Sequence, residues 1–294
     1  MSALHHASRR SALIGLGGAL LAAAATLTAP AIAAPAITEH MTEHMVDAPG
    51  ARLYVTDTGG KGPVILLAHP ATGSALIWEH QQSAFAAAGY RVVAWSRREH
   101  ARSEITGADP GTNEDILTIT KALNIGRFHF VGSAAGGGIA IQFAAAHPER
   151  LISLTMANSI SGIAEPAFKA WAEGLRPPSF NAMPAEVREL SPTYRAANPQ
   201  GAARWVDLEQ HSRIAPLGAP PRAGVTWDDV ARLPMPILWL TGDADLYVPP
   251  PLQREAGRHA RRSRYAVIPG TGHSAYWEAP DLFNQAVLAF LKRP

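Results

Sequence analysis

The sequence predicts an α/β protein with a mainly parallel central sheet, helices on both faces of that sheet, and an inserted helical cap. Short continuous apolar runs alternate with helical stretches, as expected of strands that crossover helices bury on both faces. One stretch, 161–233, interrupts this alternation because it carries frequent prolines and no convincing strand pattern. Hydrophobic residues make up 47% of the chain and charged residues 17%, a balance that favours a globular protein over a disordered one.

The first 33 residues form a targeting segment and are left out of the fold prediction. Arg9 and Arg10 precede an apolar run that ends near Thr28, and the small residues at 31–33 offer a cleavage site. Paired arginines resemble a twin-arginine signal, so we expect a bacterial protein in the periplasm or outside the cell. Since no stop-transfer flank follows the run, no stable membrane anchor is expected after signal removal.

Charge and cysteine content exclude several classes of function. The formal net charge is +2, but Arg9 and Arg10 account for all of this excess. The mature chain is therefore neutral overall, which gives no support to nucleic-acid binding. The chain has no cysteine, so disulfide bonds and a thiol nucleophile are excluded.

A short tandem repeat follows the targeting segment. The sequence Thr-Glu-His-Met at 38–41 recurs at 42–45. The two copies together give His-x-x-Glu-His from His40 to His44, a zinc-protease pattern when it lies on a buried helix with a third ligand. Here the pattern precedes the first strands, so we expect a polar linker and no metal site.

The expected elements follow in order along the chain. Alternating residues around Pro49 and Gly50 predict a hairpin over 45–58. The expected buried strands are 63–68, 91–95, 127–131, 151–156, 236–240 and 264–268. The expected cap helices are 167–175, 185–190 and 201–212, and two core helices are expected near 251–260 and 281–291. The predicted organisation is a signal (1–33), a first core part (34–160), a cap (161–233) and a second core part (234–294).

The central motif follows the strand at 127–131 and reads Gly-Ser-Ala-Ala-Gly over 132–136. A sharp strand-to-helix turn requires small residues two positions either side of its centre. Gly132 and Gly136 satisfy that requirement only if Ala134 is the centre, because a centre at Ser133 would place bulky Val131 at a flanking position. The turn therefore presents an alanine methyl where hydrolytic chemistry needs a nucleophile.

From about Met45 to its C-terminus, the chain resembles the α/β-hydrolase family. In that family an acid follows the strand after the cap, and Gly-x-x-Asp spacing from Gly242 selects Asp245. A histidine follows the last strand, where Gly-Thr-Gly-His selects His273. The order Ala134, Asp245, His273 then matches the family's nucleophile, acid and base.

The resemblance also implies an oxyanion hole built from two backbone N–H groups. One belongs to Ala135, directly after the centre of the turn. The other belongs to Ala71, in the sequence His69-Pro70-Ala71 where the family has His-Gly-x. Pro70 has no N–H, but the family's donor is the next residue, so Ala71 can serve.

Other side chains are candidates for contact with a substrate. Ser133, Trp78, Trp205 and His211 could line a pocket, although core packing or ordinary helix surface explains each equally well. A second acid–base pair could form from Glu99 and its neighbour at position 100, in a loop that replaces the family's Asp-x-Arg-Gly-x-Gly-x-Ser and loses both glycines. A solvated loop is the simpler expectation there.

In a serine form of this family, His273 takes the serine proton, Asp245 orients the imidazolium, and the two backbone donors hold the oxyanion. A methyl group at Ala134 cannot attack, and loss of the nucleophile from such a triad lowers turnover by about 10⁶, as it does in subtilisin. The sequence as given should bind its substrate and hardly turn it over. The implied substrate is a small apolar carboxylic ester or lactone, with no metal, nucleotide or flavin cofactor.

Two explanations of Ala134 remain open. In the first, the parent protein has serine at 134 and the alanine disables it, which we favour because the rest of the apparatus is complete. In the second, the alanine is natural, and His273 with Asp245 acts as a general base in a lyase-like or cofactor-free reaction, or the protein only binds ligands. An aspartate parent, as in epoxide hydrolases and dehalogenases, would give the same sequence.

Overall fold

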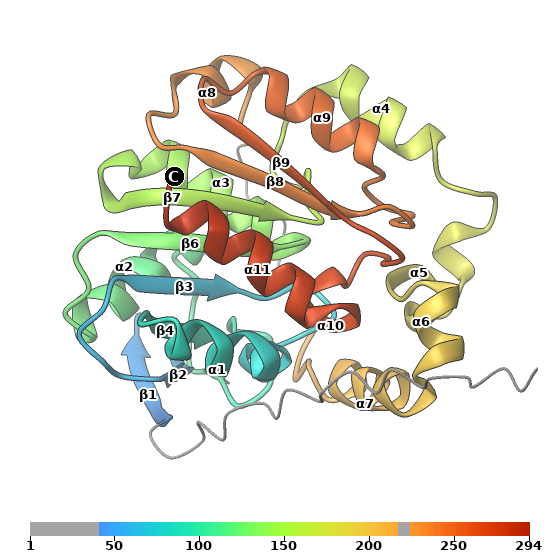
Figure 1. The fold of residues 1–294 in the computed structure, drawn as a ribbon. Helices are drawn as coiled ribbons and strands as arrows, with labels where there is room; N and C mark the ends of the chain where they lie inside the picture. The colour runs from blue at the N-terminus through green and yellow to red at the C-terminus, as the bar shows by residue number, and fades with distance from the viewer. Residues whose placement is uncertain (1–40, 217–223) are drawn as a thin grey trace, which may run out of the picture. The chain divides into compact units, whose positions relative to one another are not determined.

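The computed structural model describes residues 41–216 and 224–294, so the predicted signal at 1–33 lies outside the described residues. A sheet of nine strands forms the centre of the described part (Figure 1). Across the sheet the strands follow the order β1 (Thr42–Ala48), β2 (Ala51–Asp57), β4 (Arg91–Trp95), β3 (Val64–Ala68), β6 (Phe128–Ser133), β7 (Leu151–Ala157), β8 (Ile237–Gly242) and β9 (Ser263–Ile268). The short strand β5 (Glu104–Ile105) pairs with β2.

The sheet is mainly parallel, as predicted. All neighbouring pairs from β4 to β9 are parallel, whereas β1 and β2 form an antiparallel hairpin at one edge. The hairpin begins earlier than predicted, because pairing extends to Thr42 opposite Asp57. The second copy of the repeat is therefore strand rather than linker, and Glu43 binds Arg102 at 2.8 Å. His40 lies outside the described residues.

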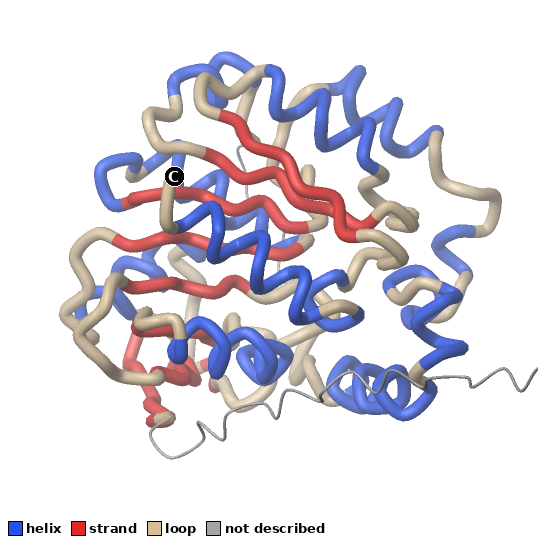
Figure 2. Tube along the Cα trace, viewed as in Figure 1, coloured by secondary structure: helices blue, strands red, loops and turns tan. Residues whose placement is uncertain are grey.

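Helices cover the two faces of the sheet (Figure 2). One face packs against α2 (Thr112–Ala122), α3 (Ala135–Ala146) and α9 (Pro250–Arg258), and the other against α1 (Glu79–Ala87) and α11 (Pro280–Leu291). Successive strand residues point to opposite faces, so Leu66 joins one hydrophobic cluster while Ile65 and Leu67 join the other. This double burial explains why the strands appear in the sequence as unbroken apolar runs.

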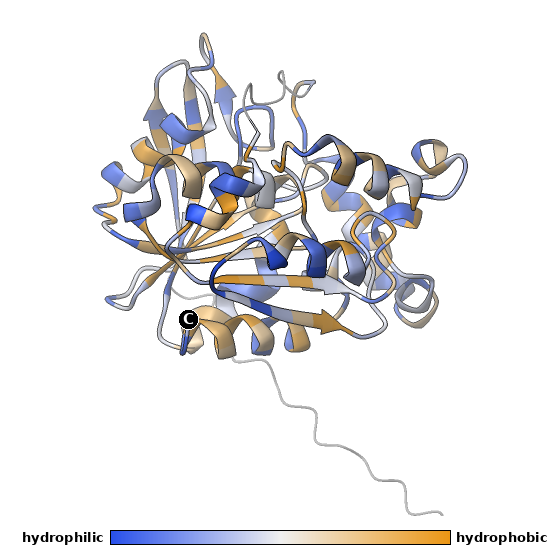
Figure 3. Ribbon diagram, turned by 90° about the horizontal axis from the view of Figure 1, so that it is seen from above, coloured by the Kyte–Doolittle hydropathy of each residue, from blue (hydrophilic) through white to orange (hydrophobic). Residues whose placement is uncertain are grey.

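Two of the inner strands, β6 and β8, are buried along their whole length. Figure 3 shows hydrophobic colouring on the strands at the centre of the molecule. The chain leaves this interior only at the strand ends. Residues that follow the parallel strands therefore meet at one edge of the sheet.

A helical segment connects β7 to β8. Its helices are α4 (Pro166–Gly174), η3 (Phe180–Ala182), α5 (Ala185–Glu189), α6 (Pro192–Ala197), α7 (Pro199–Gln210) and α8 (Trp227–Arg232). The three predicted cap helices correspond to α4, α5 and α7. The frequent prolines start helices rather than break them, because a first-turn position needs no N–H donor. Figure 1 shows α5, α6 and α7 beyond the edge to which β3 points.

The remaining short helices are η1 (Ala75–Trp78), η2 (Pro148–Arg150) and α10 (Ala275–Glu278). None of the helices in the described ranges is long and apolar enough to cross a membrane.

Candidate active site

The turn between β6 and α3 is centred on Ala134. Its backbone has φ 49° and ψ −115°, a region that residues with a side chain adopt at a cost of about 1–3 kcal/mol. A Cβ on Gly132 would lie 2.3 Å from the carbonyl oxygen of Gly136, and one on Gly136 would lie 2.1 Å from that of Ala68. Both positions therefore require glycine, as the centring on Ala134 predicts.

The turn is held by its backbone and partly open at its centre. The N–H of Ala134 donates to the carbonyl of Ala157 at 3.0 Å, and the hydroxyl of Ser159 donates to the carbonyl of Ala134 at 2.6 Å. Over 128–140, Ala134 and Ala135 alone are not buried. Ala135 is the first residue of α3, where backbone N–H groups have no intrahelical acceptor.

Asp245 and His273 form a hydrogen-bonded pair in the loops that follow β8 and β9. The Nδ1 atom of His273 lies 2.9 Å from both carboxylate oxygens of Asp245. The carboxylate also accepts hydrogen bonds from the backbone N–H groups of Tyr247 at 2.8 Å and Val248 at 2.9 Å. A proton on Nδ1 faces the acid in this arrangement, so Nε2 is left free to act as a base.

Asn158 completes the surroundings of the acid, and sequence reasoning missed it. Its amide nitrogen donates to Asp245 at 3.0 Å and to the carbonyl of Gly272 at 3.1 Å, and so joins the acid loop to the histidine loop. Asn158 directly follows β7, the strand between those of the elbow and the acid. The sequence signal that could have identified Asn158 is its position as a polar residue directly after an apolar run.

Asp245 and His273 each stabilise the charged form of the other. Burial favours the neutral form of Asp245, yet the neighbouring His273 and the hydrogen bonds hold the pKa of the carboxyl below its usual value. Burial would lower the pKa of His273, but Asp245 and then Glu189 outweigh it and raise that pKa. The pair is therefore suited to accept a proton on the imidazole while the carboxylate stays ionised.

Glu189, at the end of α5, ties the cap to the histidine loop. Its carbonyl accepts hydrogen bonds from the N–H groups of His273 at 2.8 Å and Ser274 at 3.1 Å. Its carboxyl is buried, and burial raises its pKa while His273 acts in the opposite direction. No pattern in the sequence marked this residue, because the contact depends on how the cap packs.

The ring of Tyr247 lies against the imidazole of His273, with 4.2 Å between ring centroids and 31° between planes. The ring of Phe180, in η3, packs edge-on against the Tyr247 ring, with 4.6 Å between the ring centroids. The cap and the acid loop together therefore fix the orientation of the histidine ring.

The loop after β3 carries Ala71. The carbonyl oxygen of Pro70 accepts hydrogen bonds from His69 Nδ1 at 2.7 Å, from the N–H of Gly73 at 3.1 Å and from Arg97 Nη2 at 3.2 Å. The Pro70 carbonyl and the Ala71 N–H are opposite ends of one planar peptide, so anchoring the carbonyl also fixes the N–H direction. His69 is thus a structural member of its loop.

The loop that contains Glu99 and His100 is not the solvated loop that we expected. His100 is completely buried, with its ring centroid 4.5 Å from that of His69. Burial and the charge of Arg97 lower the pKa of His100 to about 3, so its imidazole is neutral at physiological pH. Burial and the charge of Arg97 lower the pKa of His69 as well, so two neutral imidazoles pack against each other there.

Three of the predicted pocket residues take other places. Trp78 and Trp205 have no exposed surface and belong to a hydrophobic core cluster, so they contribute packing rather than an open pocket wall. His211 is exposed at the end of α7, where its Nδ1 lies 2.8 Å from the carbonyl of Asp207. Ser133 is fully buried, and its hydroxyl has no hydrogen-bond partner among the described residues, so its contact with substrate stays a prediction.

An elbow after β6, an acid after β8 and a histidine after β9 define a class of triad protein built on a helix-covered parallel sheet. The chain belongs to the alpha/beta hydrolase fold family, whose model matches residues 63–280.

Individual relatives are distant but cover most of the chain. The chain is 25% identical over 276 residues to a 2-hydroxy-6-oxononadienedioate/2-hydroxy-6-oxononatrienedioate hydrolase of Burkholderia vietnamiensis, covering 82% of this chain and 91% of that protein. Among solved structures, a thermophilic esterase from Thermogutta terrifontis is similar with a TM-score of 0.70 and 24% identity, covering 86% of this chain and 98% of that one. The enol-lactonase of Burkholderia xenovorans LB400 gives a TM-score of 0.66 and 22% identity, covering 86% and 100%.

Proposed function

We propose that the parent form of this protein, with serine at position 134, hydrolyses small carboxylic esters or lactones through an acyl-enzyme. The chain with Ala134 then binds the same substrate and hardly turns it over. The observation that carries the proposal is the buried Asp245–His273 pair, which lies in the loops beside a turn built around position 134.

Each step of the reaction has a group in this chain. The serine hydroxyl at 134 attacks the ester carbonyl while His273 Nε2 takes its proton, and Asp245 stabilises the imidazolium without being protonated. The N–H groups of Ala71 and Ala135 hold the oxyanion. His273 next protonates the leaving alcohol, and a water activated by the same base releases the acid product.

The names of the relatives support hydrolysis: one is a hydrolase of a 2-hydroxy-6-oxo dienedioate, and two solved structures are an esterase and an enol-lactonase. The scheme needs no cofactor, since base and oxyanion donors all come from the chain. Nucleic-acid binding has no part in it. We also propose that residues 1–33 export the protein to the periplasm or beyond, which fractionation of a bacterial host expressing the full chain would test.

The test of the hydrolase proposal is the Ala134→Ser variant, assayed on p-nitrophenyl butyrate. Turnover should rise by roughly 10⁶ over the chain with alanine. The fold should be unaffected, because serine and alanine carry the same Cβ at this positive φ. A second substitution, His273→Ala, should abolish the gain. A folded Ala134→Ser variant that hydrolyses none of a series of esters and lactones would refute the proposal.

The alanine itself favours a second candidate, in which His273 and Asp245 act as a general base without a covalent intermediate. This candidate requires turnover of some substrate by the chain with Ala134, and loss of that turnover in His273→Ala. Substitution also distinguishes a parent protein with aspartate at position 134. In that case Ala134→Asp would open an epoxide or displace a halide, and Ala134→Ser would do neither.

A further inference from the structure

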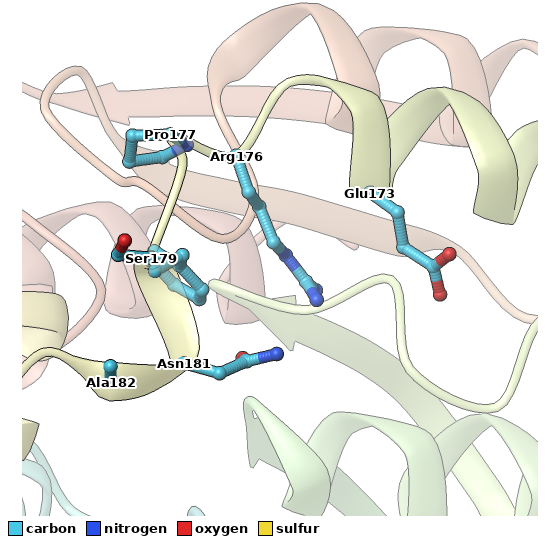
Figure 4. Close-up of a pocket in the computed structure, with 7 residues that line it drawn as sticks. Glu173, Arg176, Pro177, Ser179, Asn181 and Ala182 are labelled. Carbon is cyan, nitrogen blue, oxygen red and sulfur yellow. The ribbon is translucent and has the colours of Figure 1, made fainter.

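A pocket opens beside the candidate active site, between the end of α4 and η3. Its volume is about 620 Å³. Its lining residues are Glu173, Arg176, Pro177, Ser179, Phe180, Asn181 and Ala182 (Figure 4). Phe180 connects this pocket to the catalytic pair, because its ring packs on Tyr247 at 4.6 Å and Tyr247 packs on His273 at 4.2 Å.

Two guanidinium groups flank the same aromatic ring. The guanidinium carbon of Arg176 lies 5.4 Å from the centre of the Phe180 ring and 5.5 Å from that of Tyr247. The guanidinium carbon of Arg188, from α5, lies 5.9 Å from the Phe180 ring. Both positive charges are therefore within reach of the tyrosine–histidine stack, and both act on the pKa of Tyr247.

Neither arginine forms an ion pair within the described parts of the chain, although the charge of Arg188 acts on its neighbour Glu189. The ion pairs formed by residues 41–216 and 224–294 include neither Arg176 nor Arg188. The Nε atom of each is buried and has no hydrogen-bond partner there. Arg176 lines the pocket with a buried donor that no described group satisfies, so an anion beside it would be stabilised.

We propose that this pocket binds the anionic end of the substrate, so that the ester or lactone carries a carboxylate. This inference rests on the proposed function and specifies its substrate class: half-esters of dicarboxylic acids, or lactones with a carboxylate. Arg176 presents a planar fork of donors that matches a carboxylate, and Asn181 adds an amide donor. In Figure 4 the side chains of Arg176 and Asn181 extend into the same space, and Glu173 borders it on the other side.

The charges that line the pocket predict a preference for anionic over neutral esters. Glu173 is the acid among the lining residues, and it forms no ion pair with Arg176 within the described residues. A neutral ester would leave Arg176 without an ion-pair partner, whereas a half-ester places its carboxylate against it. In this arrangement the ester end of the ligand extends from the pocket toward His273, alongside Phe180 and Tyr247.

The experiment uses the chain with Ala134, which does not consume its ligand. Calorimetry or NMR titration compares monomethyl glutarate with methyl pentanoate, an uncharged ester of similar length. The half-ester should bind roughly 10- to 100-fold more tightly, as expected of charge-assisted hydrogen bonds, and added salt should reduce the difference. Arg176→Gln should remove most of the preference and leave methyl pentanoate binding unchanged.

Two further variants keep the inference falsifiable. Arg188→Gln should weaken half-ester binding in the same direction, which provides a second test if Arg176→Gln fails to fold. Glu173→Gln is the matched control on the same wall, and removing its negative charge should preserve or strengthen half-ester binding. Equal affinity for the two esters, or an undiminished preference in folded Arg176→Gln and Arg188→Gln, would overturn the inference.

The outcome is independent of the hydrolysis test. If Ala134→Ser is inactive while the half-ester preference holds, the anion site stands and the proposed reaction fails. If Ala134→Ser hydrolyses neutral and charged esters equally and Arg176→Gln changes neither, the reaction stands and the anion site fails.

Discussion

Replacing the acid of the pair tests the electrostatic core of the mechanism. In the Ala134→Ser background, Asp245→Asn keeps the size of the side chain but removes its negative charge. The amide can no longer accept the Nδ1 proton of His273 through both of its terminal atoms, as the carboxylate does at 2.9 Å. An imidazole with its proton on Nε2 instead cannot accept the serine proton, so kcat should fall.

The size of the effect follows from the separation of the two charges. At 2.9 Å and an effective dielectric constant of about 20, a unit charge on the carboxylate stabilises an imidazolium by about 6 kcal/mol. Each 1.36 kcal/mol corresponds to about a factor of ten in rate, so the upper bound is about four powers of ten. Delocalisation of the imidazolium charge over the ring lengthens the effective separation, and we expect a loss of roughly 10³- to 10⁴-fold in kcat.

The assay compares kcat and KM on one activated ester for both proteins, with circular dichroism to confirm folding. Asp243→Asn is the matched control, because Asp243 lies in the same loop, is exposed, and accepts a hydrogen bond from the N–H of Gly270 at 2.7 Å instead of from the histidine. Asp243→Asn should retain activity within about tenfold. The reasoning is refuted if Asp245→Asn loses less than tenfold, or if the control loses as much.

Three further predictions concern the turn and the buried glutamate. Gly136→Ala should lower the free energy of unfolding by at least about 2 kcal/mol in urea titrations, since the new Cβ would lie 2.1 Å from the Ala68 carbonyl oxygen. The control is Gly174→Ala, whose Cβ would meet nothing within 4 Å. Equal stability of the two variants would contradict this prediction. Glu189→Gln in the serine form should shift the acidic limb of kcat/KM to lower pH, because Glu189 helps to raise the pKa of His273. Because burial raises the pKa of Glu189 in the folded state, its contribution to stability is fully present below its usual value of 4.5 and lost as pH rises through the folded pKa. The gain in stability from Glu189→Gln, measured by thermal unfolding, should therefore be larger at pH 8 than at pH 4. A gain seen at acid pH alone would contradict the raised pKa of Glu189.

The local parts of the site could be predicted because each depends on a few consecutive residues. Gly132 and Gly136 set the centre of the elbow through sterics within one turn, since a side chain on Gly132 would meet the Gly136 carbonyl and one on Gly136 would meet the Ala68 carbonyl. The Gly-x-x-Asp spacing selected Asp245 over Asp243, and the structure pairs Asp245 with His273. Periodicity predicted the strands for the same reason, since burial on both faces leaves an unbroken apolar run.

Contacts across the sheet and the cap could not be predicted in this way. Asn158 reaches the acid because β7 lies between β6 and β8, an order that no local pattern encodes. Trp78 and Trp205 resembled pocket aromatics in the sequence, but both are buried where η1 and α7 pack on the core. Whether a tryptophan lines a pocket or fills a core depends on what packs over it.

Local sequence was enough to predict the strands and the sharp turn around Ala134, because sterics and periodicity act between near neighbours in the chain, whereas Asp245 and His273 were predicted from the motifs of the family that the chain resembles. Only the tertiary structure decided that Glu189 anchors the cap to the histidine loop and that Arg176 lies near the Tyr247–His273 stack without an acidic partner among the described residues. These contacts join segments far apart in the chain, and they exist only once the helices between β7 and β8 have packed over the ends of the parallel strands.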